Sequence, residues 1–250
     1  AIGPDGSIYV ADTNNERVRK LELARLTTGG VQNRASRMTG PVAANEIVVI
    51  QGLGLGPTNE TTAEPDAAGA FPTALAGTRV LFDGVAAALL STQERTVIAA
   101  VPANLGETVK LRVEYLGRLT NEVTLLVAPA APGIFTRGGE GQAAAKNEDG
   151  SENGEATPAP IGTVVTFTAT GLGRVDTDGE AVRPALPVTV TVGGVAAEVV
   201  DARVPQGQLP GVIALSVRIP EGVEPGAAVP LSVQVEQAAS QPGVTIAVSW

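Results

Sequence analysis

The chain has 250 residues, enough for one large or two ordinary domains, and it is 44% hydrophobic but only 3% aromatic, which predicts aliphatic cores. A formal net charge of −9 argues against a basic nucleic-acid footprint and against adhesion to an anionic membrane surface, and no apolar run reaches the ~20 residues of a spanning helix. His and Cys are both absent, which excludes His- or Cys-based nucleophilic catalysis, disulfide bonds and the usual zinc sites.

The first stretch predicts a β-hairpin. The strand-like runs SIYVA (7–11) and RVRKLEL (17–23) flank the turn DTNNER, in which Asp12 and Asn14 are placed to hydrogen-bond nearby backbone. A lone two-stranded hairpin is marginal in water, so we expect its strands to pair with this chain's own domains or with a second copy by strand addition. The residues expected at such a self-assembly interface are Ile8, Tyr9, Val10, Val18, Leu21, Leu23 and the terminal Trp250.

Trp250 has two interpretations. It either caps the final strand by packing against it or forms an exposed aromatic contact, and packing is the preferred interpretation. At the other end, the chain begins at Ala1 rather than Met, which is typical of a processed or trimmed chain.

An internal repeat follows the hairpin. NEIVVIQGLGLGP (45–57) matches GTVVTFTATGLGR (162–174), and TRVLFDGVAAALL (78–90) matches VTVTVGGVAAEVV (188–200), in the same order and spacing. We therefore predict a hairpin and linker at 1–29 and two homologous domains at 30–131 and 132–250. Short alternating runs and Gly-containing turns predict about seven strands in each domain. The fold class expected is all-β, with two tandem immunoglobulin-like β-sandwiches after an N-terminal β-hairpin.

The glycines of GLGLG (52–56) resemble a dinucleotide-binding loop. That loop requires a helix after the glycines, but Pro57 and a polar Thr/Ala-rich segment follow instead. The second copy repeats GLG at 171–173. We interpret these glycines as strand ends that allow a bulge or close packing.

Two acidic segments are candidate calcium sites, KNEDGSENGE (146–155) and RVDTDGE (174–180). Carboxylate oxygens are the ligands that Ca²⁺ prefers, but the spacing departs from the EF-hand loop. Asp149-Gly150 and Asn153-Gly154 are equally good turn formers, so solvated hairpin tips are the preferred interpretation. No cofactor and no catalytic residue are predicted. The weak metal candidates are Glu148, Asp149, Glu152, Asp176 and Asp178, with Glu155 nearby.

Several motifs in order resemble a known module. VQNRASRMTGPVAANEIVVIQGLGLGP, APGIF, GQAAAKNEDGS and GTVVTFTATGLG resemble the Solibacter-type C-terminal module of predicted secreted acidobacterial proteins, which is similar to tandem IPT/TIG-type immunoglobulin-like domains. PDGSIYVADTNNERVRK is similar to one NHL repeat, a β-propeller blade, and NHL propellers often precede this module. The resemblance supplies no catalytic residue and implies an extracellular or cell-surface, non-catalytic role.

Three function classes follow. A single blade without its propeller favours a structural subunit that binds copies of itself through its N-terminal strands and forms a filament. The alternative is a stalk or adhesion module of a longer NHL-propeller protein that contacts a protein, a carbohydrate or the cell surface, although one Trp and two Tyr offer little for sugar stacking. An enzyme has no positive feature in this sequence, and we predict none. Two prolines in APAAPGIF (128–135) predict a short, semi-rigid joint between the domains.

Overall fold

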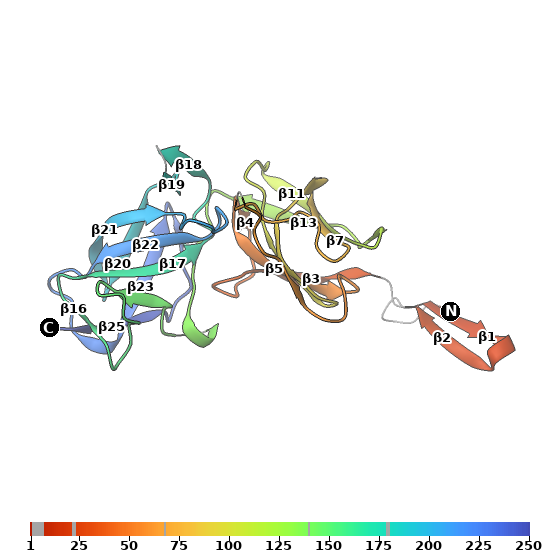
Figure 1. Ribbon diagram of the computed structural model, residues 1–250, viewed down its shortest axis with the longest axis horizontal. Coiled ribbons are helices and arrows are strands. Elements are labelled where there is room, and N and C mark those ends of the chain that lie inside the picture. The colour runs from red at the N-terminus through yellow and green to blue at the C-terminus, as the bar shows by residue number, and fades with distance from the viewer. Residues whose placement is uncertain (2–7, 22–23, 68, 140, 179–180) are drawn as a thin grey trace.

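The computed structural model shows an all-β chain, with two β-sandwiches preceded by a hairpin (Figure 1). It describes residues 1, 8–21, 24–67, 69–139, 141–178 and 181–250. Leu23, a residue of the predicted self-assembly interface, lies outside the described residues, as do the side chains of Ile8, Leu21 and Asp178.

The hairpin consists of β1 (Ile8–Asp12) and β2 (Arg17–Leu21), which pair antiparallel with Ile8 opposite Leu21. Its turn passes through η1 (Thr13–Asn15), and the Asn15 side chain donates to both carboxylate oxygens of Asp12 at 3.0 Å. Asp12 therefore stabilises the turn through the Asn15 side chain, without a side-chain bond that caps η1. The expected bonds from Asp12 and Asn14 to nearby backbone stay a prediction. Figure 1 shows the hairpin beyond the end of the first sandwich, apart from both sandwiches.

The N-terminal sandwich occupies residues 24–128. Alternation along β11 buries Val109, Leu111 and Val113 against the facing sheet and leaves Lys110 and Arg112 exposed. One sheet consists of β3 (Arg25–Asn33), β5 (Ile47–Leu53), β10 (Thr96–Ala100), β9 (Leu89–Thr92) and β6 (Thr61–Thr62) in that spatial order. The other consists of β4 (Val42–Ala43), β13 (Val123–Ala128), β11 (Thr108–Tyr115), β7 (Thr78–Phe82) and β8 (Val85–Ala86), with β12 (Arg118–Leu119) beside β11.

The C-terminal sandwich occupies residues 133–250. On one face lie β14 (Gly133–Ile134) and β15 (Ala145–Asn147), both beside β17 (Val164–Thr170), followed by β22 (Ile213–Arg218) and β21 (Val195–Arg203). On the other lie β20 (Val188–Val192), β23 (Gly226–Val235), β25 (Thr245–Ser249) and β16 (Ala159–Pro160), with β24 (Ala238–Ala239) beside β23. β21 belongs to both faces. Its residues 195–197 pair with β20, and its residues 198–203 pair with β22, with a bulge between Val199 and Asp201.

The two sandwiches have the same connectivity, as the internal repeat predicts. The matched segments NEIVV and GTVVT form β5 and β17, which occupy the same place in their sheets. In each sandwich a short strand, β4 or β16, runs parallel to the last strand, β13 or β25, and the ladders between the other named strands are antiparallel. Two antiparallel sheets packed face to face in this order are immunoglobulin-like sandwiches. The predicted fold class is confirmed.

One of the two predicted domain limits lies between two strands of the structure, and the other lies inside a strand. The limit between residues 131 and 132 lies in the segment that connects β13 to β14, whereas the limit between 29 and 30 lies inside β3. The segment RVDTDGE enters an additional hairpin, β18 (Val175–Asp178) and β19 (Ala181–Pro184). In the parts of the chain that the structure describes, no helix has the length and apolar character needed to span a membrane.

The C-terminal core predicts a large cost for truncating Phe167. Its side chain is 1% exposed and packs among aliphatic residues from both faces. Phe167→Ala is expected to lower the free energy of unfolding by about 3–5 kcal/mol, through lost burial and the cavity left behind. Urea denaturation measures this. Leu126→Ala, at an exposed position, is the control and should change stability by no more than about 0.5 kcal/mol; similar losses in the two variants would contradict the core assignment.

Candidate functional site

The two sandwiches meet at an apolar contact. Ile47 and Ala100, from β5 and β10 of the N-terminal sandwich, pack against Leu209 in the loop that precedes β22. Ile47 is 1% exposed and Leu209 is 6% exposed, although both lie outside the cores of their own sandwiches. The partly buried residues around this contact are Phe71, Ala88, Leu90, Ile98 and Val212. The junction therefore excludes water from its centre.

Hydrogen bonds cross the same junction. The Ile47 backbone N–H donates to Thr170 Oγ1 at 2.9 Å, and the Asn45 side chain donates to the Gly173 carbonyl at 3.3 Å. The Asn33 side chain donates to the Ala131 carbonyl in the connecting segment at 2.9 Å. Because Asn33 Oδ1 also accepts from two backbone N–H groups of the turn after β3, one buried amide joins that turn to the connection.

Glycine permits the close approach of the backbones. A Cβ on Gly171 would overlap the Ala131 carbonyl oxygen, and one on Gly173 would overlap the Pro129 carbonyl oxygen. A Cβ on Gly211 would overlap the carbonyl oxygen of Asn45 in the other sandwich. The repeated GLG segment is thus a packing device, as the sequence interpretation holds.

The first copy of the glycine motif supports the same interpretation. A Cβ on Gly52 would overlap the Arg25 carbonyl oxygen on β3, and the β3–β5 ladder is irregular between Leu26 and Val31. The segment after Gly56 is not helical, so the geometry of a dinucleotide-binding loop is not formed there.

Glu46 is a buried acid beside the junction. It is 2% exposed, and its carboxylate accepts a hydrogen bond from the Ala43 N–H at 2.7 Å. Burial raises the pKa of Glu46 to about 8, although hydrogen bonds from Ala43 and from the Asn33 side chain act in the opposite direction. Glu46 lies at a cleft of about 270 Å³ between the 36–42 loop, the connecting segment and β24, and it is the one carboxyl group among the described residues that line this cleft. Among its described lining residues, the cleft therefore lacks the carboxylate pair that most glycoside hydrolases use.

The acidic segment 146–155 is held by local hydrogen bonds. Glu148 accepts from the Val164 N–H at 3.2 Å, and Glu152 pairs with Arg137 at 3.3 Å. Asp149 accepts from both the N–H and the hydroxyl of Ser151, and these bonds lower the pKa of Asp149. Glu148, Asp149 and Glu152 thus each have a structural partner, as expected of a turn, and Glu155 is exposed.

Asn153 anchors this segment in the core of the C-terminal sandwich. It is fully buried, and its side chain bonds the Ala247 backbone in both directions at 2.8 Å. Asp176 is exposed on β18, opposite Arg183. Among the described residues, no three His, Cys, Asp or Glu side chains are placed to share a metal ion. Calcium binding stays a prediction.

The predicted self-assembly residues with described side chains are accessible to different degrees. Val18 is 68% exposed and Val10 is 42% exposed, whereas Tyr9 is half-buried. Trp250 is 89% exposed, so the preferred interpretation of a packed cap is wrong. The reason is that β25 ends at Ser249, and the indole lies beyond the last residue that its neighbours pair with.

The junction residues were not singled out by sequence reasoning. Asn33, Asn45 and Glu46 stand in the stretch VQNRASRMTGPVAANE, where they read as polar loop residues between short apolar runs. Their one signal is position, because Asn45 and Glu46 directly precede the buried strand β5. No sequence pattern marks Leu209 as a buried contact residue, because it lies in a loop, where side chains do not alternate as they do along a strand.

Comparisons with known proteins do not assign the chain to a family. No family model matches it, and no curated protein matches it. Of the solved structures, the plexin A4 extracellular region is 15% identical over 92% of this chain and 19% of its own, with a TM-score of 0.31. A surface glycan-binding protein from Prevotella bryantii is 16% identical, with coverages of 91% and 42% and a TM-score of 0.27.

The titin I9–I11 tandem is 13% identical over 99% of this chain and 76% of its own, with a TM-score of 0.24. The chain spans less than half the length of the plexin and glycan-binding chains. At these TM-scores the likenesses carry no argument about what the chain binds. The class that its own strand order defines is a tandem of immunoglobulin-like β-sandwiches.

The buried acid predicts a pH-dependent stability. Because the pKa of Glu46 is higher in the folded chain than its ordinary value of 4.5, the unfolded state releases its proton first as pH rises. Stability should therefore fall between about pH 5 and pH 8, by about 1.4 kcal/mol per pH unit at most, and then level off. Glu46→Gln should remove this slope in urea denaturation series. Glu60→Gln, at an exposed position, controls for the lost charge; parallel curves for wild type and Glu46→Gln would contradict the assignment.

Proposed function

We propose that this chain is a rigid, non-catalytic spacer of an extracellular or cell-surface protein, which holds its two sandwiches in one fixed orientation. The observation that carries the proposal is the junction, where the apolar contact at Leu209, the bonds from Asn33 and Ile47, and the close backbone approach at Gly211 act together. A flexible tether needs none of these. The motifs that resemble a module of secreted proteins support the extracellular location.

The non-catalytic part of the proposal rests on the side chains present. The chain has no His or Cys. Among the described carboxyl groups, Glu46 lines its cleft alone, and Glu148, Asp149 and Glu152 are engaged in turns or with Arg137. An arrangement of this kind suits a structural module.

Gly211→Ala tests the rigid junction. The added Cβ would strike the Asn45 carbonyl in the other sandwich, so the change should separate the two units while each stays folded. Small-angle scattering of the wild type should fit one interdomain orientation, and the variant should show a broad distribution. Gly40→Ala, where a Cβ meets no atom within 4 Å, is the matched control. A broad distribution for the wild type itself would overturn the proposal.

Self-assembly through the hairpin is the second candidate. The hydrogen bonds between Ala1 and Tyr9 show that the Tyr9 backbone groups point away from β2. Backbone groups alternate in direction along a strand, so the N–H and C=O of Ala11, two residues on, also point away from β2. Val18 is paired with Ala11, and its own N–H and C=O therefore point to the outer edge of β2. No hydrogen bond from this N–H is present within the described part of the chain. An open strand edge of this kind favours strand addition by a second copy.

Val18→Pro tests this candidate. It removes the outward N–H and leaves the bonded pairs of the β1–β2 ladder, because proline is tolerated on strand edges. If the hairpin donates strands, filaments seen by electron microscopy should disappear in Val18→Pro and persist in Val18→Thr, which keeps the N–H. A chain without residues 1–23, which retains β3, should also be monomeric. A monomeric wild type at high concentration would leave the spacer as the function and rule out assembly.

A further inference from the structure

A groove of mixed polar and apolar lining crosses the outer face of the C-terminal sandwich. Its volume is about 940 Å³. Its floor is formed by β17, β22 and the end of β21, and its wall by β19 and the loop 204–208. The wall is tied to the hairpin, since the Val204 N–H donates to the Val182 carbonyl at 2.8 Å. This groove is separate from the junction and from the hairpin β1–β2.

The register of the sheet places four polar residues in one row, of which Thr166, Ser216 and Asp201 line the floor and Lys146 lies beyond it. Lys146 stands opposite Thr166, Thr166 opposite Ser216, and Ser216 opposite Asp201. The reason is alternation, because Val165, Phe167, Leu215 and Val217 fill the core and their neighbours point outward. The Thr166 and Ser216 hydroxyl oxygens are 2.8 Å apart. The floor therefore presents a pair of hydroxyl groups flanked by opposite charges.

Three cations lie in or beside the groove and can each meet one carboxylate of a ligand: Arg203 lines it, and Arg183 and Lys146 stand next to it. Asp201 is the one carboxylate among the described residues that line it, and it is shared by Arg183 and Arg203, each at 2.9 Å. The Nε of Arg183 is buried and has no hydrogen-bond partner in the described part of the chain. Lys146 is exposed at the end of the row. Asp176 lies opposite Arg183 and Glu148 lies two residues from Lys146, so cations and carboxylates alternate around the groove. A ligand here meets both positive and negative groups.

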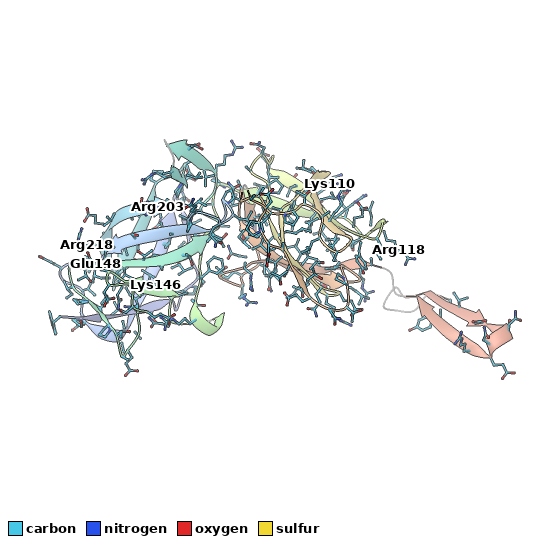
Figure 2. All side chains as sticks on the ribbon, viewed as in Figure 1. Lys110, Arg118, Lys146, Glu148, Arg203 and Arg218 are labelled. Carbon is cyan, nitrogen blue, oxygen red and sulfur yellow. The ribbon has the colours of Figure 1, made fainter. Side chains whose placement is uncertain are left out.

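Figure 2 shows Lys146 and Arg203 on the C-terminal sandwich, with Glu148 and Arg218 between and beside them. Arg218 is already engaged, since it pairs with Glu198 at 3.0 Å and donates to the Gly162 carbonyl at 2.9 Å. Glu148 is occupied by the Val164 N–H. Lys146 is exposed at the end of the row, and Arg203 lines the groove while it pairs with Asp201 at 2.9 Å. Their positions make them the cations of this face that a ligand in the groove would meet.

The sheet face also limits the chemistry of the ligand. The floor strands bond one another, so their backbone groups are not free to pair with a peptide strand, and recognition falls to side chains. No aromatic residue is among the described lining residues, so the stacking that holds neutral sugars is missing. Hydroxyl, amide, carboxylate and guanidinium groups remain, and these match a polyhydroxylated anion.

We propose that this groove binds a segment of acidic polysaccharide. Arg203 and Lys146 bind its carboxylates, while Thr166, Ser216 and Asp201 hydrogen-bond its hydroxyl groups. The glutamines at 206 and 208, on the loop that forms the wall, lie at the rim where they reach the chain of sugars. The proposal does not depend on the spacer function, because the groove lies within one sandwich.

The test is calorimetric titration of the full chain with polygalacturonate at low ionic strength. The wild type should bind, and binding should weaken as salt is added, because the contacts are ionic. Arg203→Glu and Lys146→Glu should each weaken binding about tenfold or more, since each reverses one charge-assisted contact. Thr166→Val, which keeps the shape and removes the hydroxyl, should weaken it about threefold, as loss of one neutral hydrogen bond does.

Arg118→Glu is the matched control. Arg118 is an exposed cation on the far sandwich (Figure 2), so this reversal makes the same change in net charge and should leave binding unchanged. Dextran, a neutral glucan, should not bind. Three results would overturn the proposal: no binding of polygalacturonate to the wild type, equal weakening by Arg118→Glu and Arg203→Glu, or equal affinity for poly-glutamate, which carries the charge without the sugar hydroxyls.

Discussion

The close approach of three backbone segments is the constraint on which the rest of this architecture depends. The connecting segment passes so near the end of β17 that only glycine fits at 171 and 173, and the loop before β22 lies so near Asn45 that only glycine fits at 211. Backbones this close leave no space for water, so their polar groups must bond one another. Asn33, Asn45 and Thr170 supply those bonds, and Leu209 fills the remaining space.

This constraint also accounts for the buried acid. A carboxyl group at Glu46 caps the N–H of Ala43 at the turn that leads into β5, and the same turn supports Asn45 at the junction. Burying a carboxyl group is costly when it is ionised, and a raised pKa is the consequence. The junction thus combines tight packing with a group whose ionisation works against folding at high pH.

The two sandwiches use one connectivity for different purposes. In the N-terminal copy the chain between residues 85 and 92 is divided into two strands, β8 and β9, which belong to different sheets. Ala88, between them, and Leu90, in β9, pack at the junction. In the C-terminal copy the equivalent region is the continuous β21, whose bulge at Val199–Asp201 carries Asp201 and Arg203 onto the open face. The additional hairpin β18–β19 then covers one side of that face. The two sandwiches thus share one strand order, and they differ in the strands just described. The difference gives the N-terminal copy its part of the junction and the C-terminal copy its groove.

The sequence by itself determined the fold class, the internal duplication and the structural role of the glycines and of the 146–155 turn, because alternation, turn residues and repeat spacing act locally. Asp149 and the GLG segments behave as their local patterns predict. Only the tertiary structure decided that β3 begins at Arg25, that Trp250 is exposed, that Asn33 and Leu209 hold the junction, and that Thr166, Ser216, Asp201 and Arg203 share one face. These facts depend on register and on hydrogen bonds between residues as much as 128 positions apart, which no local pattern encodes.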